Sequence, residues 1–137
     1  MSAKEKSRRL ISLKIQAPDG TIIESNRKHS PAFHVDNNGT TYMVDYDPLW
    51  PRVASDGNHI DMWVYDDSPF SQIRESFTWG TYGINGDRPL EWTKLKDMTD
   101  NHIRAIIDGG HAWLNEYLFE MEVEYRNDLK TIYKNMP

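Results

Sequence analysis

The sequence predicts an α+β fold, in which an antiparallel sheet of hairpins precedes a set of helices. Two observations carry this prediction. Up to residue 66, apolar residues alternate with polar ones, which is the period of a strand with one buried face. From residue 69 onward, apolar residues recur at spacings of three and four, which is the period of an amphipathic helix.

Two hairpins are expected at the start. Their four strands lie in RRLISLKIQA, TIIES, AFHVD and TTYMVDY, between residues 8 and 46. Pro18-Asp19-Gly20 joins the first pair of strands, and Asn37-Asn38-Gly39 joins the second. Both tripeptides form turns, and Asn-Gly in particular adopts the positive φ angles of tight hairpin turns.

The next segment is expected to be a loop followed by a single strand. Residues 47–58 (DPLWPRVASDGN) contain two prolines and include Arg52. HIDMWVYD, residues 59–66, alternates again, so Ile60 and Val64 are expected on the same face of one strand.

A short helix and a short strand follow. Ser68 is a good N-cap residue and Pro69 suits the first helical position, which predicts a helix over PFSQIRESF, residues 69–77. After a loop rich in aromatic residues and glycine, LEWTKL (90–95) predicts a strand.

Two helices are expected at the C-terminal end. Thr99 caps the first, TDNHIRAIID, which ends at Gly109-Gly110. The second begins near Ala112 and runs nearly to the C-terminus, with Glu122 and Arg126 as an i, i+4 ion pair. Its many apolar residues are expected either to cover the sheet or to pack against another copy of the chain.

Length, charge and composition bound the function. The 137 residues suit one domain, 1–137, with residues 1–8 as a flexible tail. The absence of cysteine excludes disulfides and zinc–thiolate sites. The net charge is −5, and residues 1–30 carry +4 (seven Lys or Arg against three Asp or Glu), which leaves −9 elsewhere. An acidic body argues against DNA binding, and no apolar run is long enough for a membrane span.

Nothing in the sequence specifies an enzyme. The chain has no HExxH, no G-x-S-x-G elbow and no P-loop. His59 and Asp61, two residues apart, make the closest pair of metal-ligand type, but a solvated or hydrogen-bonded histidine explains the pair better. We therefore expect no catalytic residue, no metal and no cofactor.

ESFTWGTYGINGDRPLEW, residues 75–92, is the stretch that points to a ligand. Flat rings stack on nucleobases, and glycines let backbone amides approach a ligand closely. Phe77, at the end of the short helix, is a candidate stacking ring. Asn85 and Asp87, beside Gly86, are candidates for hydrogen bonds to a sugar or a base.

Phosphates of such a ligand would need arginines. Arg52, in the proline-containing loop, and Arg104, in the middle of a helix, are the candidates. The plainer interpretation is that the aromatic stretch caps the core, with Phe77 as a core residue and Arg104 solvated.

A run of short motifs covers residues 69–107. A short helix ends in F-x-W-G, a Y-G-x-N-G-D-x-P-L loop follows, and K-L-K-D-M-[ST]-x-x-H comes next. With ESNRKHSPAFHVDNNGTTYMVDY upstream, the pattern spans roughly residues 20–108. It resembles the first-described class of anti-Thoeris phage proteins, which sequester the signalling nucleotide made by bacterial TIR-domain proteins.

The resemblance implies a ligand, an assembly and a set of contacts. The ligand would be glycocyclic ADP-ribose, bound without cleavage in the host cytoplasm, with cyclic trinucleotides at a separate site in some members. The protein would form homodimers with pockets at the dimer edges, and these can assemble into a hexamer. Phe77 would stack on adenine, Arg104 would contact the pyrophosphate, and Arg52 would supply a further anion contact. Either Asn85 or Asp87 would make a polar contact, and Asp87 suits a ribose hydroxyl better than a phosphate.

Two other functions compete with this one. An enzyme that hydrolyses such a nucleotide would release a changed product from a heated complex, whereas a sequestering protein would release the intact nucleotide. A phage protein-interaction module would not bind the nucleotide at all, which calorimetry would detect.

Overall fold

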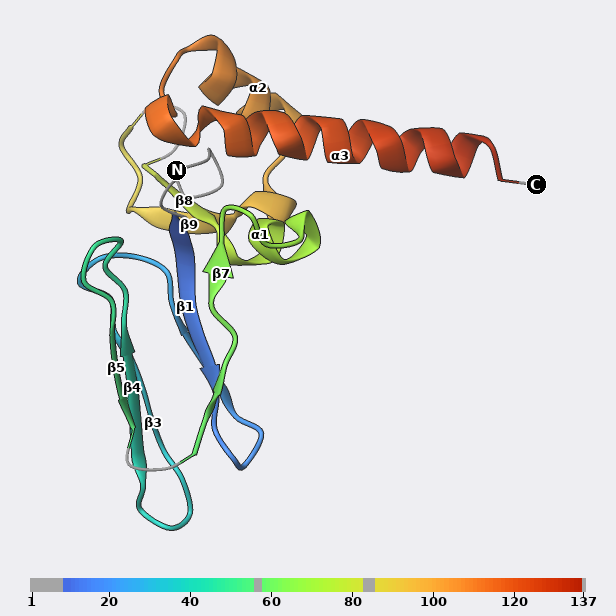
Figure 1. Ribbon diagram of the computed structural model, residues 1–137. Helices are drawn as coiled ribbons and strands as arrows, with labels where there is room; N and C mark the ends of the chain where they lie inside the picture. Colours follow the sequence, from blue (N-terminus) through green and yellow to red (C-terminus); the bar gives the residue numbers. More distant parts are fainter. Residues whose placement is uncertain (1–8, 56–57, 83–85, 137) are drawn as a thin grey trace, which may run out of the picture. The chain divides into compact units, whose positions relative to one another are not determined.

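The computed structural model describes residues 9–55, 58–82 and 86–136. The fold is α+β, as predicted: antiparallel strands come first, a short helix follows, and a long helix ends the chain (Figure 1). The chain divides into two compact units, residues 1–77 and 78–137.

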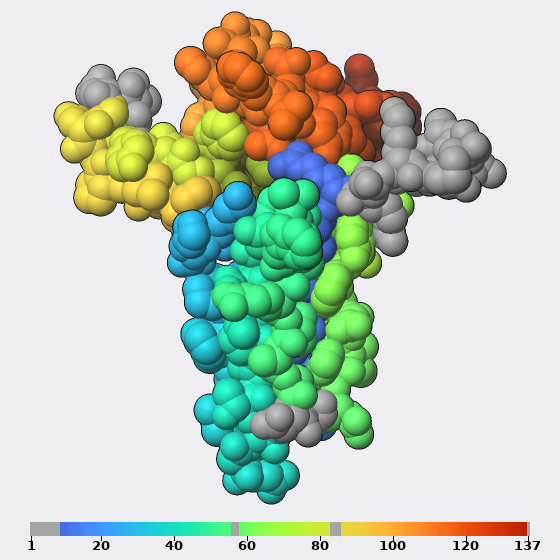
Figure 2. All heavy atoms as spheres, turned by 60° about the vertical axis from the view of Figure 1, so that its left-hand side comes forward, coloured from blue at the N-terminus to red at the C-terminus, as the bar shows by residue number. Residues whose placement is uncertain are grey.

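The first unit contains two antiparallel sheets. Its strands are β1 Leu10–Gln16, β2 Ile22–Ser25, β3 Ala32–Val35, β4 Thr41–Asp45, β5 Arg52–Ser55, β6 Ile60–Asp61 and β7 Val64–Tyr65. In one sheet, β1 lies between β2 and β6 and also pairs with β7. The other sheet has the order β3-β4-β5, and its strands come forward in Figure 2, coloured cyan to green.

The two sheets share one apolar core. Its buried members alternate along β1, β2 and β4; they are Leu13, Ile15, Ala17, Ile23, Tyr42 and Val44. On β3 the period of two leaves Phe33 and Val35 exposed, on the face opposite to the core. The alternation that predicted these strands therefore also gives their buried faces.

The hairpin turns form where the sequence predicts them. Gly20 and Gly39 have φ angles of +91° and +81°, values that glycine adopts without a steric penalty. In the second turn, Asp36 Oδ1 accepts hydrogen bonds from the N–H groups of Asn38 and Thr40, both at 2.9 Å. This side chain replaces turn hydrogen bonds that the backbone does not make.

The prediction of a loop over residues 47–58 is wrong, because β5 lies inside it and pairs with β4. Pro51 precedes β5 directly, a position at which a missing N–H disrupts no ladder hydrogen bond. The single strand expected over residues 59–66 is also wrong. It consists of β6 and β7, which both pair with β1, so Ile60 is exposed while Val64 is buried.

Helix α1, Phe70–Ser76, lies where it was expected but is not capped by Ser68. The residue at the cap position is Pro69, and Ser68 Oγ instead accepts the N–H of Tyr65 at 2.9 Å. The helix ends at Phe77, whose N–H donates to the carbonyl of Ile73 at 2.8 Å.

The second unit combines a two-stranded ribbon with two main helices. Its elements are β8 Thr78–Thr81, β9 Glu91–Lys94, the 3₁₀ turn η2 Leu95–Asp97, α2 Asp100–Asp108, the 3₁₀ turn η3 Trp113–Asn115 and α3 Glu116–Lys134. The cap at Thr99 is confirmed, since its hydroxyl accepts the N–H of His102 at 3.2 Å. β8 was expected as part of a loop, and α3 begins after η3 rather than at Ala112.

Candidate functional site

Arg104, on α2, is the predicted site residue around which the structure forms a groove. Its exposed side chain lines two adjoining hollows between α2 and α3. The larger hollow, of about 140 Å³, is lined by Arg104, Ile107, Asp108, Glu120 and Val123. The smaller hollow, of about 70 Å³, is lined by Asp100, Arg104, Val123, Arg126, Asn127 and Lys130. We call them the Ile107 end and the Lys130 end of the α2–α3 groove.

Helix periodicity explains why Arg104 stands at the rim of this groove. Ile103 and Ile106 are buried, so Arg104 lies at the edge of the apolar stripe of α2. Gly110, with a φ of +66°, ends the helix in the left-handed conformation and lets the chain return as α3.

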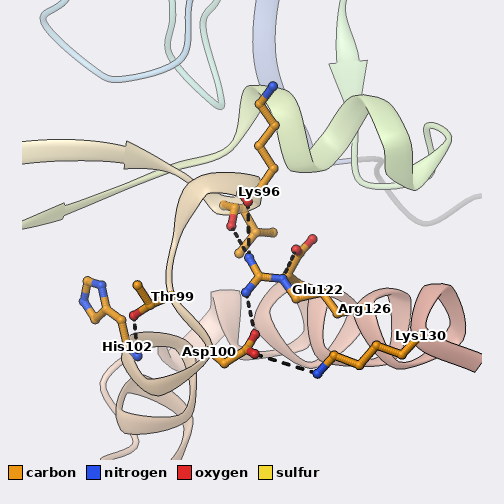
Figure 3. A network of polar contacts seen from close by, with 8 residues as sticks. Lys96, Thr99, Asp100, His102, Glu122, Arg126 and Lys130 are labelled. Carbon is orange, nitrogen blue, oxygen red and sulfur yellow. Dashed lines mark hydrogen bonds and ion pairs between the residues drawn. The ribbon is translucent and has the colours of Figure 1, made fainter. Parts of the chain in front are cut away.

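Arg126, on α3, organises the Lys130 end of the groove (Figure 3). Its guanidinium donates to Glu122 at 2.5 Å and to Asp100 at 2.7 Å, so the predicted pair with Glu122 is confirmed. It also donates to the backbone carbonyls of Leu95 at 3.2 Å and Lys96 at 3.3 Å. Glu122 is fully buried. One guanidinium therefore holds α3 against η2 and the start of α2.

These contacts keep the polar groups at the Lys130 end charged. The hydrogen bond from Arg126 lowers the pKa of Asp100, and this effect outweighs the opposing effect of burial. The positive charges of Lys130 and Arg104 lower the pKa of Asp100 further. Burial lowers the pKa of Arg126, but the hydrogen bonds to Asp100 and Glu122 outweigh it and raise that pKa.

Arg104 differs from Arg126 because its guanidinium is not occupied by protein groups. Among residues 9–55, 58–82 and 86–136, it makes no hydrogen bond and no ion pair. A guanidinium presents five N–H donors and never loses its charge at physiological pH. At a concave surface, such a group is suited to bind a carboxylate or a phosphate.

Phe77 and Arg52 lie in the first unit, whereas Arg104 lies in the second. Only 8% of Phe77 is exposed, so its position is that of a buried residue, and stacking on adenine stays a prediction. Arg52 is on β5, where its guanidinium pairs with Asp45 of β4 at the surface. An anion bound by Arg52 would share it with that carboxylate.

The polar contacts predicted near Gly86 are only partly within the described residues. Asn85 lies outside them. Asp87 is exposed between Gly86 and Arg88, and the N–H of Arg88 donates to the carbonyl of Tyr82 at 2.8 Å. The choice between Asn85 and Asp87 stays open.

Ring packing explains part of the aromatic and glycine-rich stretch. Gly80 of β8 lies opposite Trp92 of β9, and a Cβ at Gly80 would come within 3.0 Å of the Trp92 ring. Trp79 meets Phe119 of α3 edge to face, with ring centroids 5.2 Å apart. The packing of the ribbon therefore explains the glycine at position 80.

The first unit contains a larger hollow, and none of its described lining residues is arginine or lysine. It measures about 330 Å³ and is lined by Gln16, Ala17, Pro18, Gly20, Asn58, His59 and Ile60. His59 Nε2 lies 3.1 Å from Asp61 Oδ1, which agrees with the interpretation of His59 as a hydrogen-bonded histidine. Within the described part of the chain, no three His, Cys, Asp or Glu side chains are grouped to hold a metal. For an anionic ligand, the α2–α3 groove is the better site despite its smaller volume.

Sequence reasoning missed most of the groove. The lining residues that were not predicted are Asp100, Ile107, Asp108, Glu120, Val123, Asn127 and Lys130. The chain reversal at Gly109-Gly110 indicates two antiparallel helices. This was the signal in the sequence that residues of the two helices face each other across a groove. The 3₁₀ turn η3 lies between the two helices and changes which residues of α2 and α3 face each other. Counting residues outward from Gly109-Gly110 therefore does not predict the facing pairs.

No family model, curated protein or solved structure matches this chain. None of the helices within the described residues is long and apolar enough to cross a bilayer.

Proposed function

We propose that this protein binds and sequesters glycocyclic ADP-ribose, the signal of bacterial TIR proteins, without cleaving it, and so blocks Thoeris immunity in the host cytoplasm. One observation carries the proposal: the unpaired guanidinium of Arg104 stands in the middle of the α2–α3 groove. The motif resemblance independently assigns the pyrophosphate contact to the same arginine. Cyclic trinucleotides are a second ligand class in this proposal.

The required affinity is within reach of a small site. Competition with a host receptor needs a Kd near 1 nM, or about −12 kcal/mol. A ligand of roughly three dozen heavy atoms at about −0.3 kcal/mol per atom reaches about −11 kcal/mol. Charge-assisted contacts from arginine and one stacked ring supply interactions of the right kind, and no covalent step is needed.

Phe77, Arg52 and either Asn85 or Asp87 are the other contacts that the motif resemblance implies. Because Phe77 is buried, stacking requires its ring to become uncovered when the ligand binds. Truncation of a buried phenylalanine to alanine costs about 3–5 kcal/mol of stability, so Phe77→Ala would confuse unfolding with lost stacking. Phe77→Leu removes the flat ring and keeps most of the volume.

Homodimerisation, with a hexamer as a larger assembly, belongs to the same proposal. All residues of the end of α3, from 127 to 134, are exposed. This end of the helix is the one nearest the C-terminus in Figure 1. Leu129, Ile132 and Tyr133 lie on it at the spacings of an apolar helix stripe. Such a stripe on a second copy of the chain is a complementary partner.

Isothermal calorimetry with glycocyclic ADP-ribose tests the proposal. The wild type is expected to bind at nanomolar concentration. Arg104→Ala is expected to lose about 1.5–3 kcal/mol of binding free energy, because a charge-assisted contact is removed. Lys134→Ala, at the far end of α3, removes the same charge away from the groove and should bind as the wild type does.

Three results would contradict the proposal. The wild type could fail to bind the nucleotide, which favours the protein-interaction module. Arg104→Ala could bind as tightly as Lys134→Ala, which removes the groove from the proposal. The complex could release a changed nucleotide on heating, which favours the hydrolase.

A further inference from the structure

We infer that the Lys130 end of the α2–α3 groove binds the phosphates of the ligand, and that Lys130, which lies beside Asp100 in the free protein, is a second phosphate contact. The inference rests on the proposed function, because it gives the direction in which a nucleotide lies along the same groove.

Three cations gather around the single carboxylate of Asp100. Arg126 Nη1 lies 2.7 Å from Asp100 Oδ1, and Lys130 Nζ lies 3.9 Å from Asp100 Oδ2. Figure 3 shows Asp100 between these two side chains. Arg104 lines the same hollow. Positive charge therefore exceeds negative charge along the lining of this end.

The three cations differ in their freedom to bind a ligand. The guanidinium of Arg126 donates to Glu122, Asp100 and two backbone carbonyls, so its hydrogen bonds stabilise the fold. Lys130 is exposed, and its contact with Asp100 is at the outer limit of an ion pair, which is weak at a surface. Lys130 and Arg104 are thus the two cations that an incoming phosphate can engage.

The opposite end of the groove repels phosphate. Asp108 and Glu120 line the Ile107 end, where Arg104 is the single cationic lining residue described. Carboxylates accept hydrogen bonds from ribose hydroxyls but oppose a second anion. Ile107 and Val123 between them offer apolar contact. This gradient of charge places sugar at the Ile107 end and phosphate at the Lys130 end.

Asp100 has a role that simple charge counting would miss. Its carboxylate lies 3.9 Å from Lys130 Nζ and therefore competes with a phosphate for Lys130. Asp100→Asn keeps an oxygen acceptor for Arg126 and removes the competing charge. It is therefore expected to strengthen phosphate binding, whereas Lys130→Ala weakens it.

Calorimetry with two probes, glycocyclic ADP-ribose and inorganic pyrophosphate, tests the inference. Lys130→Ala is expected to weaken the binding of both probes about tenfold, because one charge-assisted contact is lost. Asp100→Asn is expected to strengthen both about threefold at low salt, because a like charge near the anion is removed. Glu120→Gln is expected to weaken the binding of the nucleotide and to leave the binding of pyrophosphate unchanged. Lys134→Ala controls for the loss of one positive charge on α3, and circular dichroism checks the helicity of every variant.

The outcomes separate the inference from the proposed function. If Arg104→Ala loses the nucleotide but Lys130→Ala matches Lys134→Ala, the inference is overturned and the proposed function stands. The inference is also overturned if Asp100→Asn, with native helicity, weakens pyrophosphate as much as Lys130→Ala does. If the wild type binds neither probe, the inference and the proposed function are both overturned.

Discussion

At the scale of the residue, one carboxylate joins a turn to the core of the first unit. Asp36 Oδ1 accepts the N–H groups of Asn38 and Thr40, and Asp36 Oδ2 accepts the hydroxyl of Tyr42 at 3.2 Å. Tyr42 is buried, and burial together with the hydrogen bond to Asp36 raises its pKa. The side chain that shapes the hairpin turn therefore also satisfies a polar group of a core residue.

Asp36→Ala is expected to destabilise the protein by about 2–3 kcal/mol, because the turn contacts are lost and the buried hydroxyl of Tyr42 loses its acceptor. Urea denaturation followed by circular dichroism measures the change. In a Tyr42→Phe background, the same substitution should cost about 1 kcal/mol less, since no hydroxyl is left unpaired. Equal costs in both backgrounds would show that the hydroxyl does not depend on Asp36.

At the scale of the element, the contacts of Arg126 determine how α3 sits against α2. The guanidinium reaches the buried Glu122 on its own helix, Asp100 at the start of α2, and two carbonyls of η2. Three segments of the second unit therefore meet at one side chain. Because the groove lies between α2 and α3, the same contacts fix the distance across it.

Arg126→Ala is expected to lower the free energy of unfolding by about 3–5 kcal/mol, because the buried charge of Glu122 loses its ionic partner. Thermal or urea denaturation measures the loss. Arg126→Leu combined with Glu122→Leu should recover part of it, since the buried charge is removed along with its partner. The double variant would argue against a charge effect if it were less stable than Arg126→Ala.

At the scale of the whole molecule, the exposed end of α3 is the surface that an assembly would cover. Leu129, Ile132 and Tyr133, three of its apolar residues, are exposed. Of the two expectations for this helix, covering the sheet and packing against another copy, neither is tested. An exposed apolar stripe on a helix of 19 residues favours pairing of helices. Pairing of two copies stays a prediction.

Ile132→Asp is expected to shift the protein from dimer to monomer, because a charge cannot be buried without a partner in an apolar interface. Sedimentation velocity should give twice the chain mass of 16.0 kDa for the wild type and a single chain for the variant. Thr131→Asp adds the same charge on a different face of α3 and should leave the dimer intact. A wild type that sediments as a single chain at all concentrations would contradict the pairing.

Local chemistry made much of the fold predictable. The turns at Gly20 and Gly39 and the cap at Thr99 depend on the residue itself and its near neighbours, so the sequence predicts them correctly. β5 and β8 were missed because their short sequences carry no clear alternation, and their pairing with β4 and β9 makes them strands.

The site was predictable to a smaller extent. Arg104 was a predicted site residue, and the structure places it at a groove, while its contact with a ligand stays a prediction. Lys130 and Glu120 were not predicted as lining residues, because their position at the groove depends on the register between α2 and α3. That register is set by η3, where Trp113 adopts a left-handed φ of +50°. A bulky side chain rarely has this conformation, and no local pattern signals it.

Glu122, fully buried beside Arg126, also limits how this chain can evolve. Loss of Arg126 alone takes this ionic partner from the buried carboxylate of Glu122, whereas loss of Glu122 alone leaves Arg126 paired with Asp100. A change at Arg126 is therefore expected to be tolerated best when Glu122 changes with it.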